Sequence, residues 1–348
     1  MNAELAPFEA LAKEVLRRCF AEEDPTLLQQ WLLETVARMG GGADAEAAIL
    51  TWVDSFDLYD RIMEQRALAA VQPDAEKRTL DWKWQSWNNF IDPLEPGLLA
   101  VLSAGDGMGK TIYAEELAEH WAQKRNRVVF VHYELNRSIM LDRRTARHTS
   151  IPRRVLKSGL LDAEQTKRLT AIRPRLLAWD GYITYMHTPG WSMDRVVSEL
   201  RRLRAEGQCD VVVLDYLEKN SASRRQIQLF GQNVYQREAD NVEQIKNFAE
   251  STETPALMLT QMSKAGKTSS FDSLDRTAMR GAGEKSEKAN IVVLLNREHT
   301  SDGYSNTVDV RVDKNTVGRT GTFQQYMEPE FFRVADLQRV QLQSSAGK

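Results

Sequence analysis

The sequence predicts an α/β fold in which helices cover both faces of a mainly parallel sheet, preceded by a small all-helical domain. Residues 1–72 show only helical periodicity, with apolar residues three and four positions apart. From residue 96 onward, short apolar runs alternate with helical stretches, a succession typical of parallel sheets. A polar, proline-containing stretch separates the two patterns. We therefore expect a helical domain over 1–72, a linker over 73–95 and an α/β domain over 96–348.

The elements of the α/β domain follow one another in a regular order. We expect strands over 97–104, 127–134, 209–217 and 255–262, and helices over 111–125, 192–207 and 241–252. The continuous apolar run Val211–Leu214 fits the buried centre of the sheet. Three further strand-like runs, 290–298, 306–314 and 321–329, have short connections, so we expect them to form an antiparallel extension.

Composition excludes several classes of protein. Of 348 residues, 42% are hydrophobic and 27% are charged, which is the balance of a soluble globular chain. The two cysteines are far apart and the five histidines lack the spacing of zinc ligands, so neither disulfides nor a zinc site is expected. No apolar run approaches the roughly 20 residues that span a bilayer. We expect a cytoplasmic protein that makes no contact with membranes.

A glycine-rich stretch, "LSAGDGMGKT" at 102–111, lies between a predicted strand and a predicted helix. Glycines let backbone N–H groups turn toward phosphates, a lysine reaches the β- and γ-phosphates, and a following threonine binds Mg²⁺. Lys110 and Thr111 fill these two positions, and we expect Lys110 to face solvent before nucleotide binds. The predicted nucleotide contacts are Ala104, Gly105, Asp106, Gly107, Met108, Gly109, Lys110, Thr111, Ile112 and Arg143.

Three further predicted strands end on polar residues. Asp215 is placed to orient Mg²⁺ together with Thr111, Glu134 to activate the attacking water, and Gln261 to sense the γ-phosphate. All three would lie at the edge where parallel sheets bind ligands. A capping aspartate and a solvated strand end are the alternatives for Asp215 and Glu134. The nucleotide interpretation predicts ATP and Mg²⁺ as cofactors.

From about residue 96 to 337, the chain resembles the C-terminal motor domain of replicative hexameric helicases of the DnaB type, which has a RecA-like P-loop ATPase fold. The family loop also opens with alanine, as in "ARPxMGKT", and here the loop reads "AGDGMGKT". Further segments with matching motifs are "VVFVHYELN", "VVVLDYLE", "LMLTQMSK" and "AMRGAGEKSEKANIVVLLNRE". The resemblance implies that Glu134 is the catalytic glutamate, Asp215 the Walker B carboxylate and Gln261 the motif glutamine.

One motif departs from the family pattern. The family usually ends in "KQRNGPxG" or "KNRxxGxxG", whose arginine enters the active site of the neighbouring subunit. Here the segment is "DKNTVGRTG", in which Lys314 matches but Thr316 stands at the arginine position. We expect Arg319 to supply the missing guanidinium, with Lys314 sharing the charge, and Arg311 is the alternative.

Two basic segments are candidates for contacting DNA. Residues 219–237 contain four basic residues and no acidic one, and residues 262–288 are also rich in lysine and arginine. Both follow strands at the predicted ATP-binding edge, where such loops can bind phosphates without reading base sequence. The predicted DNA contacts are Arg224, Arg225, Lys264, Lys267, Arg280, Gly281 and Gly283. The alternative is that these loops are merely solvated surface.

The resemblance implies an ATP-dependent, 5′-to-3′ DNA helicase that acts in replication as a homo-hexameric ring on single-stranded DNA. A primase or a helicase loader is the expected protein partner. Two other functions stay open. One is a RecA-like DNA-binding ATPase that serves as a recombination mediator or regulatory ring without unwinding. The other is an assembly protein that binds ATP only to close its ring, which Thr316 makes conceivable.

Overall fold

The computed structural model describes residues 59–64, 67, 79–134, 136–215, 220–262, 286–301 and 303–337. The chain divides into two compact units, Met1–Gln72 and Pro73–Lys348. Of the first unit, residues 59–64 form helix. The helices expected earlier in the chain lie outside the described residues. The second unit contains the sheet and the candidate site.

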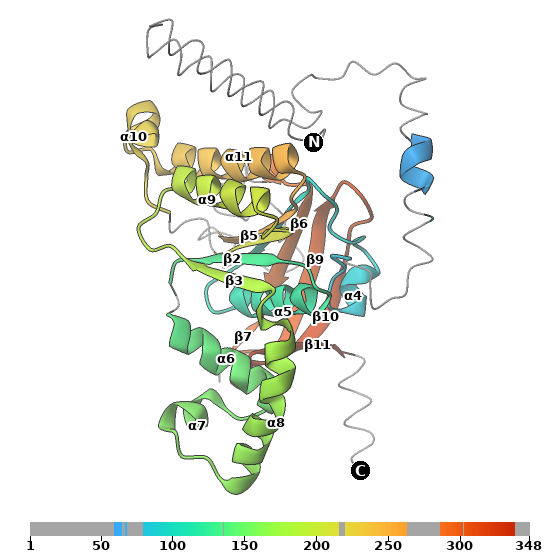
Figure 1. Ribbon diagram of the computed structural model, residues 1–348, viewed down its shortest axis with the longest axis vertical. Coiled ribbons are helices and arrows are strands. Elements are labelled where there is room, and N and C mark those ends of the chain that lie inside the picture. The colour runs from blue at the N-terminus through green and yellow to red at the C-terminus, as the bar shows by residue number, and fades with distance from the viewer. Residues whose placement is uncertain are drawn as a thin grey trace, which may run out of the picture. The chain divides into compact units, whose positions relative to one another are not determined.

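The second unit is built on a nine-stranded sheet, in the order β11-β10-β9-β6-β1-β5-β4-β2-β3 (Figure 1). The strands are β1 (Leu99–Ala104), β2 (Val128–His132), β3 (Ile183–His187), β4 (Val211–Asp215), β5 (Ala256–Gln261), β6 (Ile291–Asn296), β9 (Thr307–Asn315), β10 (Gly321–Glu328) and β11 (Arg333–Asp336). A separate hairpin joins β7 (His299–Thr300) to β8 (Gly303–Tyr304). Strands β1 to β6 pair in parallel, and the last three strands pair antiparallel. The predicted α/β class with a mainly parallel sheet is confirmed.

The prediction for the three final runs is wrong in one respect. β6 pairs in parallel with β1, with Leu102 opposite Val293, and the antiparallel part begins only at β9. The physical reason is burial: Ile291 to Leu295 form a continuous apolar run, buried throughout, as expected for an internal parallel strand. Four strands were not expected from the sequence, namely β3 and β11 of the sheet and the short β7 and β8 of the hairpin.

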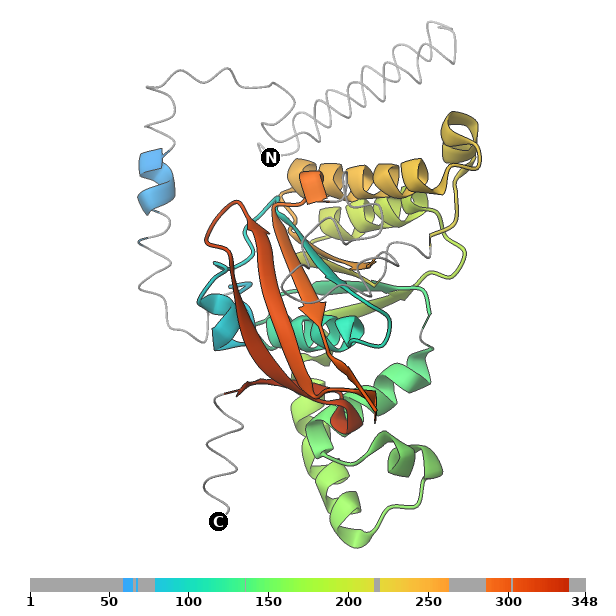
Figure 2. The ribbon, with the colours of Figure 1, turned by 180° about the vertical axis from the view of Figure 1, so that it is seen from behind.

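Helices cover both faces of the sheet (Figures 1 and 2). One face carries α9 (Met193–Ala205) and α11 (Val234–Thr252), with the short α10 (Arg224–Phe230) before α11. The other carries α5 (Lys110–Gln123) and α4 (Gln85–Asn88), and beyond them lie α6 (Arg137–Thr149), α7 (Arg153–Ser158) and α8 (Ala163–Asp180). Each face has its own apolar core. Alternate residues of β1 belong to different cores, with Val101 on the α9–α11 side and Leu102 on the α5 side.

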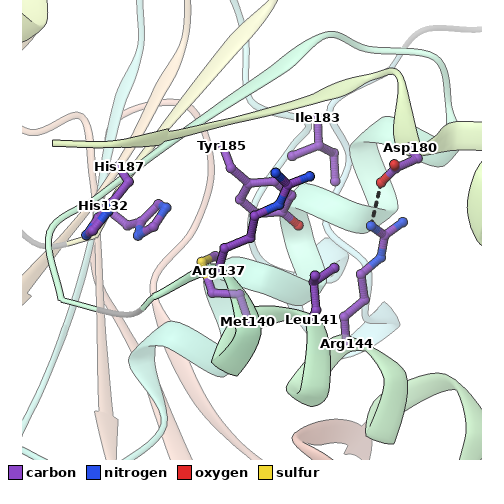
Figure 3. Close-up of a pocket in the computed structure, with 9 residues that line it drawn as sticks. All are labelled: His132, Arg137, Met140, Leu141, Arg144, Asp180, Ile183, Tyr185 and His187. Atoms are coloured by element: carbon purple, nitrogen blue, oxygen red, sulfur yellow. Dashed lines mark hydrogen bonds and ion pairs between the residues drawn. The ribbon is translucent and has the colours of Figure 1, made fainter.

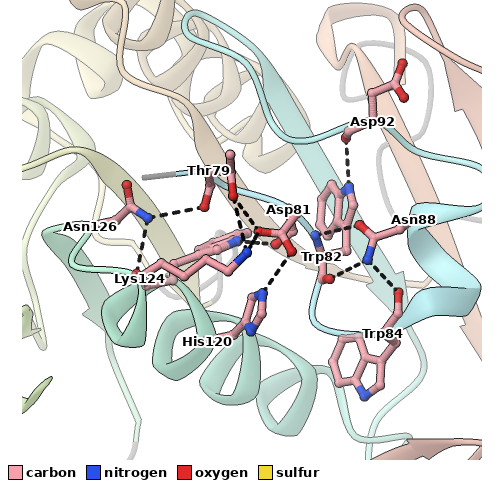
Figure 4. Close-up of polar contacts among 10 residues, drawn as sticks. Thr79, Asp81, Trp82, Trp84, Asn88, Asp92, His120, Lys124 and Asn126 are labelled. Carbon is pink, nitrogen blue, oxygen red and sulfur yellow. Dashed lines mark hydrogen bonds and ion pairs between the residues drawn. The ribbon is translucent and has the colours of Figure 1, made fainter. Parts of the chain in front are cut away.

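Part of the predicted linker packs into the core. In the stretch 79–95, the side chains of Trp82, Trp84 and Trp87 are buried among residues of α5 and of the sheet. The carboxylate of Asp81 accepts hydrogen bonds from His120 of α5 and from Lys124, the residue at the C-cap of α5 (Figure 4). Asn88 closes the tryptophan turn by accepting from the Trp82 backbone N–H at 2.9 Å and donating to its carbonyl at 2.7 Å. This segment therefore fixes the start of the second unit to the helix that follows the glycine loop.

Among the described residues, none of the helices combines the length and the apolar character needed to traverse a bilayer.

Candidate nucleotide-binding site

The glycine loop connects the buried strand β1 to helix α5, which begins at Lys110. Gly109 is the N-cap of α5 and has a left-handed backbone with φ of 98°. A Cβ at this position would also collide with the side chain of Met327. Only glycine satisfies both conditions, so the loop can turn its N–H groups toward an anion at the start of α5.

Lys110 does not face solvent, contrary to our expectation. Its residue is 9% exposed, and its Nζ donates hydrogen bonds to the backbone carbonyls of Ala104 and Gly105, both at 2.9 Å. A buried ammonium needs acceptors, and the carbonyls at the end of β1 supply them. The ammonium is thereby held within the loop.

The strand ends meet at one cavity of about 540 Å³. Its lining consists of Asp106, Gly107, Gly109, Lys110, Thr111, Ile112, Glu134, Arg143, Asp215, Gln261 and Phe332. The register explains why: Ala104 lies opposite Gln261 in β1 and β5, and His132 lies opposite Asp215 in β2 and β4. Of the predicted loop contacts, Ala104, Gly105 and Met108 do not line this cavity. The structure thus brings together Glu134, Asp215, Gln261 and the loop.

Asp215 has the electrostatics of a metal ligand. The residue is 7% exposed. Burial raises the pKa of its carboxyl group to about 6, and a hydrogen bond from the Thr111 side chain partly offsets this rise. Its Oδ1 is buried and has no hydrogen-bond partner among the described residues. An oxygen with an unsatisfied lone pair beside a threonine hydroxyl fits Mg²⁺, which prefers oxygen ligands.

Glu134 and Gln261 lie on the more open parts of the same cavity. Glu134 is exposed and follows β2 by two residues. Gln261 ends β5, and its Nε2 donates to Oδ1 of Asp106 at 2.8 Å. Gln261 is therefore hydrogen-bonded directly to the phosphate loop, so that a change at one can be transmitted to the other.

Arg143 reaches the cavity from helix α6. Its Nε lies 3.4 Å from Oε1 of Glu115, and its guanidinium stacks over the ring of Phe332 at 4.9 Å. The neighbouring Arg147 pairs with Glu115 and Glu119 and donates to the Phe332 carbonyl at 2.7 Å. This buried ionic network joins α5, α6 and the turn before β11, and it holds one cation at the wall of the nucleotide cavity.

The residue that supports the loop from behind was not predicted from the sequence. Arg297 follows β6, is 5% exposed, and donates from Nε to the Ser305 carbonyl at 2.6 Å. Its other nitrogens approach the carbonyls of Gly107 at 3.4 Å and Tyr304 at 3.3 Å. An arginine directly after a continuous apolar strand, in "VVLLNRE", was the available signal.

Lys314 and Arg319 do not line the cavity. Lys314 lies opposite Val292 near the start of β6, whereas the glycine loop lies beyond the other end of the parallel strands. The Nζ of Lys314 donates hydrogen bonds to the carbonyls of Ser286 and Glu287. Arg319 is exposed, donates to the Asn89 carbonyl at 2.8 Å and 2.6 Å, and lies over the Phe90 ring. Any role for either residue in catalysis therefore requires the cavity of another subunit.

The predicted DNA contacts are described only in part. Arg225 forms ion pairs with Asp194 at 3.1 Å and Asp240 at 2.5 Å, which tie α10 to α9 and α11. Arg224 is exposed and makes no ion pair or hydrogen bond with the described residues. Of this pair, Arg224 is the one that could contact a phosphate without breaking an ion pair. Lys264, Lys267, Arg280, Gly281 and Gly283 lie outside the described residues.

Comparison with known proteins finds relatives among replicative helicases. The replicative DNA helicase DnaB of Leifsonia xyli subsp. xyli is 24% identical over 306 residues, covering 85% of this chain and 65% of the relative. The DnaB of Geobacillus stearothermophilus is 25% identical over 245 residues, covering 69% and 53%. A probable plasmid replicative DNA helicase of Chlamydia trachomatis is 22% identical and covers 71% and 52%. The chain thus spans between half and two thirds of the length of these relatives.

Solved structures show the same fold. A DnaB-like replicative helicase, studied for its interactions with primase, superposes with a TM-score of 0.70 at 16% identity, covering 94% of this chain and 75% of its own. The ATPase domain of G40P gives a TM-score of 0.68 at 16% identity, covering 80% and 98%. The sequence model of the DnaB-like helicase C terminal domain matches residues 80–336, most of this chain. The chain belongs to the DnaB-like helicase C-terminal domain family.

Proposed function

We propose that this protein is an ATP-dependent DNA helicase of the DnaB type, which moves along single-stranded DNA as a homo-hexameric ring and unwinds duplex during replication. The observation that carries the proposal is the nucleotide cavity. It brings Lys110 and Thr111 of the phosphate loop together with three residues from other strand ends, Glu134, Asp215 and Gln261. The order of these residues also matches the family motifs.

Each side chain has a defined part in hydrolysis. The N–H groups at the start of α5 and the Lys110 ammonium bind the β- and γ-phosphates of ATP. Thr111 and Asp215 would hold Mg²⁺, which neutralises phosphate charge when it is bound. Glu134, exposed at the open side of the cavity, accepts a proton from the attacking water. Gln261, hydrogen-bonded to Asp106, couples the γ-phosphate to the segment that follows β5.

The DNA contact and the partners follow from the same family membership. Arg224 and the basic residues after Gln261 bind the DNA backbone, and a primase or a loader is the protein partner. Because the relatives are bacterial replicative helicases, we infer that the protein acts in the cytoplasm. Arg319 would act on the nucleotide of a neighbouring subunit, because it does not line the cavity of its own chain.

One observation favours a second function. Thr316 occupies the position of the family arginine, and Arg319 is held by the Asn89 carbonyl of its own chain. If Arg319 does not reach a neighbouring nucleotide, hydrolysis falls by about 10³-fold or more. The chain would then act as a RecA-like DNA-binding ATPase that switches state without unwinding.

Measuring ATP hydrolysis with and without single-stranded DNA tests the proposal. The wild-type protein should hydrolyse ATP faster when DNA is present. Glu134→Gln should keep ATP affinity and lose about 10²-fold or more in rate, because an amide cannot accept the proton of water. Glu95→Gln, at an exposed glutamate away from the cavity, is the matched control and should retain the wild-type rate. Hydrolysis by Glu134→Gln at the parent rate would show that the general base lies elsewhere.

A further inference from the structure

A second cavity, of about 350 Å³, lies between helix α6 and two strands, the edge strand β3 and its neighbour β2 (Figure 3). Its lining comes from four elements, β2, α6, α8 and β3, and it shares no residue with the nucleotide cavity. The nine lining residues are His132, Arg137, Met140, Leu141, Arg144, Asp180, Ile183, Tyr185 and His187. The proposed helicase mechanism does not use this cavity, although His132 lies within the motif "VVFVHYELN".

The charges around this cavity are predominantly cationic. Arg137 is exposed in the first turn of α6 and makes no ion pair or hydrogen bond with the described residues. Arg144 pairs with Asp180 at 2.5 Å, so the single carboxylate in the lining is already compensated. The Nε of Arg144 is buried and finds no acceptor within the described part of the chain. An anion in this cavity would meet the uncompensated guanidinium of Arg137.

Two imidazoles add further donors. His132 and His187 lie opposite each other in β2 and β3, and their rings stack with centroids 4.8 Å apart and planes 13° apart. Figure 3 shows this pair at one end of the cavity and the Arg144–Asp180 pair at the other. His132 is 4% exposed, so one imidazole forms part of the cavity floor. An imidazole N–H can donate a hydrogen bond to a phosphate oxygen.

The rest of the lining is apolar or aromatic. Tyr185 offers a ring edge-on to His132 at 6.4 Å, and Met140, Leu141 and Ile183 complete the wall. Ligand sites commonly combine such an apolar surface with a few convergent polar groups. We propose that this cavity binds a small organic phosphate, with Arg137 and the two imidazoles around the phosphate and the Tyr185 side against the organic group.

Because of the position of the cavity, a ligand bound there can affect the nucleotide site through the elements that the two cavities share. Helix α6 contributes Met140 and Arg144 to this cavity and Arg143 to the nucleotide cavity. In the sheet, His132 lies directly opposite Asp215. A ligand that shifts α6 or His132 therefore acts on residues adjacent to the ATP phosphates. This proposal is independent of whether the chain unwinds DNA.

The experiment is a calorimetric titration of the full chain with phenyl phosphate. The protein is first saturated with ADP and Mg²⁺, and ADP binding is measured separately, so that occupation of the nucleotide cavity is known. Inorganic phosphate and phenol are titrated in parallel. The variants are Arg137→Ala and His187→Asn, both at exposed positions, and Arg154→Ala is the matched control, because that side chain is 83% exposed on α7.

We expect phenyl phosphate to bind saturably at one site per chain, more tightly than phenol. Arg137→Ala and His187→Asn should each weaken binding about tenfold, the usual effect of losing a hydrogen bond to a charged group, whereas Arg154→Ala should bind like wild type. Inorganic phosphate binding as tightly as phenyl phosphate would assign the same cationic site to free phosphate. Equal affinity for phenol and phenyl phosphate, or unchanged affinity in both cavity variants, would overturn the proposal.

Discussion

Asp215 shows how a single buried carboxylate can link stability to function. Burial raises the pKa of its carboxyl group from 3.8 to about 6, so in the folded protein the ionised form is disfavoured. Because the folded pKa is above the unfolded one, the stability contributed by this group is present below pH 4 and is lost as the pH rises through 6. A pKa difference of about 2 corresponds to about 3 kcal/mol.

Asp215→Asn should therefore stabilise the protein when no nucleotide is bound. We expect its free energy of unfolding to equal that of wild type near pH 4 and to exceed it by up to about 3 kcal/mol near pH 8. Urea unfolding across this pH range measures the difference. The same variant should lose Mg²⁺-dependent hydrolysis. Asp92→Asn, at an exposed side chain, is the control and should show no such dependence. A constant difference between Asp215→Asn and wild type at all pH values would contradict the account.

Arg297 supports the phosphate loop from outside it. Its planar guanidinium approaches three backbone carbonyls, those of Ser305, Tyr304 and Gly107. A lysine keeps the charge but cannot present this fork. Arg297→Lys should lower the free energy of unfolding by about 1–3 kcal/mol and weaken ADP binding, since Gly107 loses its support. Thermal unfolding and ADP titration check this, with the exposed Arg154→Lys as control. If Arg297→Lys has the thermal stability and the ADP affinity of wild type, Arg297 does not support the phosphate loop.

At the scale of elements, the stretch 79–95 shapes the β9–β10 hairpin. Asn315 donates to the Phe90 carbonyl at 3.0 Å, and the Phe90 ring stacks on Phe323 with centroids 5.4 Å apart. A Cβ at Gly321 would collide with the Phe90 ring. The stretch 79–95 thus fixes the hairpin that carries Arg319.

Gly321→Ala should destabilise the protein by about 1–3 kcal/mol, the usual cost of overpacking. The cost should be smaller in a Phe90→Ala background, where the opposing ring is gone, so the two substitutions should couple in a double-mutant cycle. Denaturant unfolding of the four proteins measures the coupling. Additive effects would mean that Phe90 does not shape the hairpin.

Elements could be predicted where burial leaves a simple pattern. The internal parallel strands are continuous apolar runs, so their positions were predicted from the sequence. β3, "ITYMH", is an edge strand whose middle residues are exposed, and it lacks such a run. The tryptophans of 79–95 were missed because their spacings, first two residues and then three, do not continue a single helical or strand period. β6 was assigned to the wrong kind of pairing because sequence order does not reveal that it lies beside β1.

In the candidate site, the residues at the ends of predicted strands could be predicted from the sequence, and the others could not. Glu134, Asp215 and Gln261 each follow a recognisable strand, and parallel strands bring their ends to one edge. Arg297 and Phe332 reach the site from the antiparallel side of the sheet, and no local sequence pattern predicts that they lie near it. The burial of Lys110 depends on two carbonyl groups, which a sequence motif does not describe.

At the scale of the whole molecule, the account requires subunits to share active sites. Arg319→Ala should lower DNA-stimulated hydrolysis by about 10³-fold while ATP affinity and ring assembly are retained. Mixing Arg319→Ala with Glu134→Gln should restore part of the activity, because some interfaces then contain an intact Glu134 and an intact Arg319. Steady-state hydrolysis at several mixing ratios measures this. Wild-type turnover by Arg319→Ala would transfer the role to Arg311 or show that no arginine is needed.

Strand displacement from a forked DNA duplex, with ATP hydrolysis followed in the same reaction, tests the central claim most directly. The account predicts that the wild-type protein releases the displaced strand only when ATP is hydrolysed. It also predicts that Lys110→Ala does neither, because the phosphate loop has lost its cation. DNA-stimulated hydrolysis without strand release would contradict the helicase account and favour a DNA-bound switch. The absence of hydrolysis by the wild-type protein in the presence of DNA would contradict both.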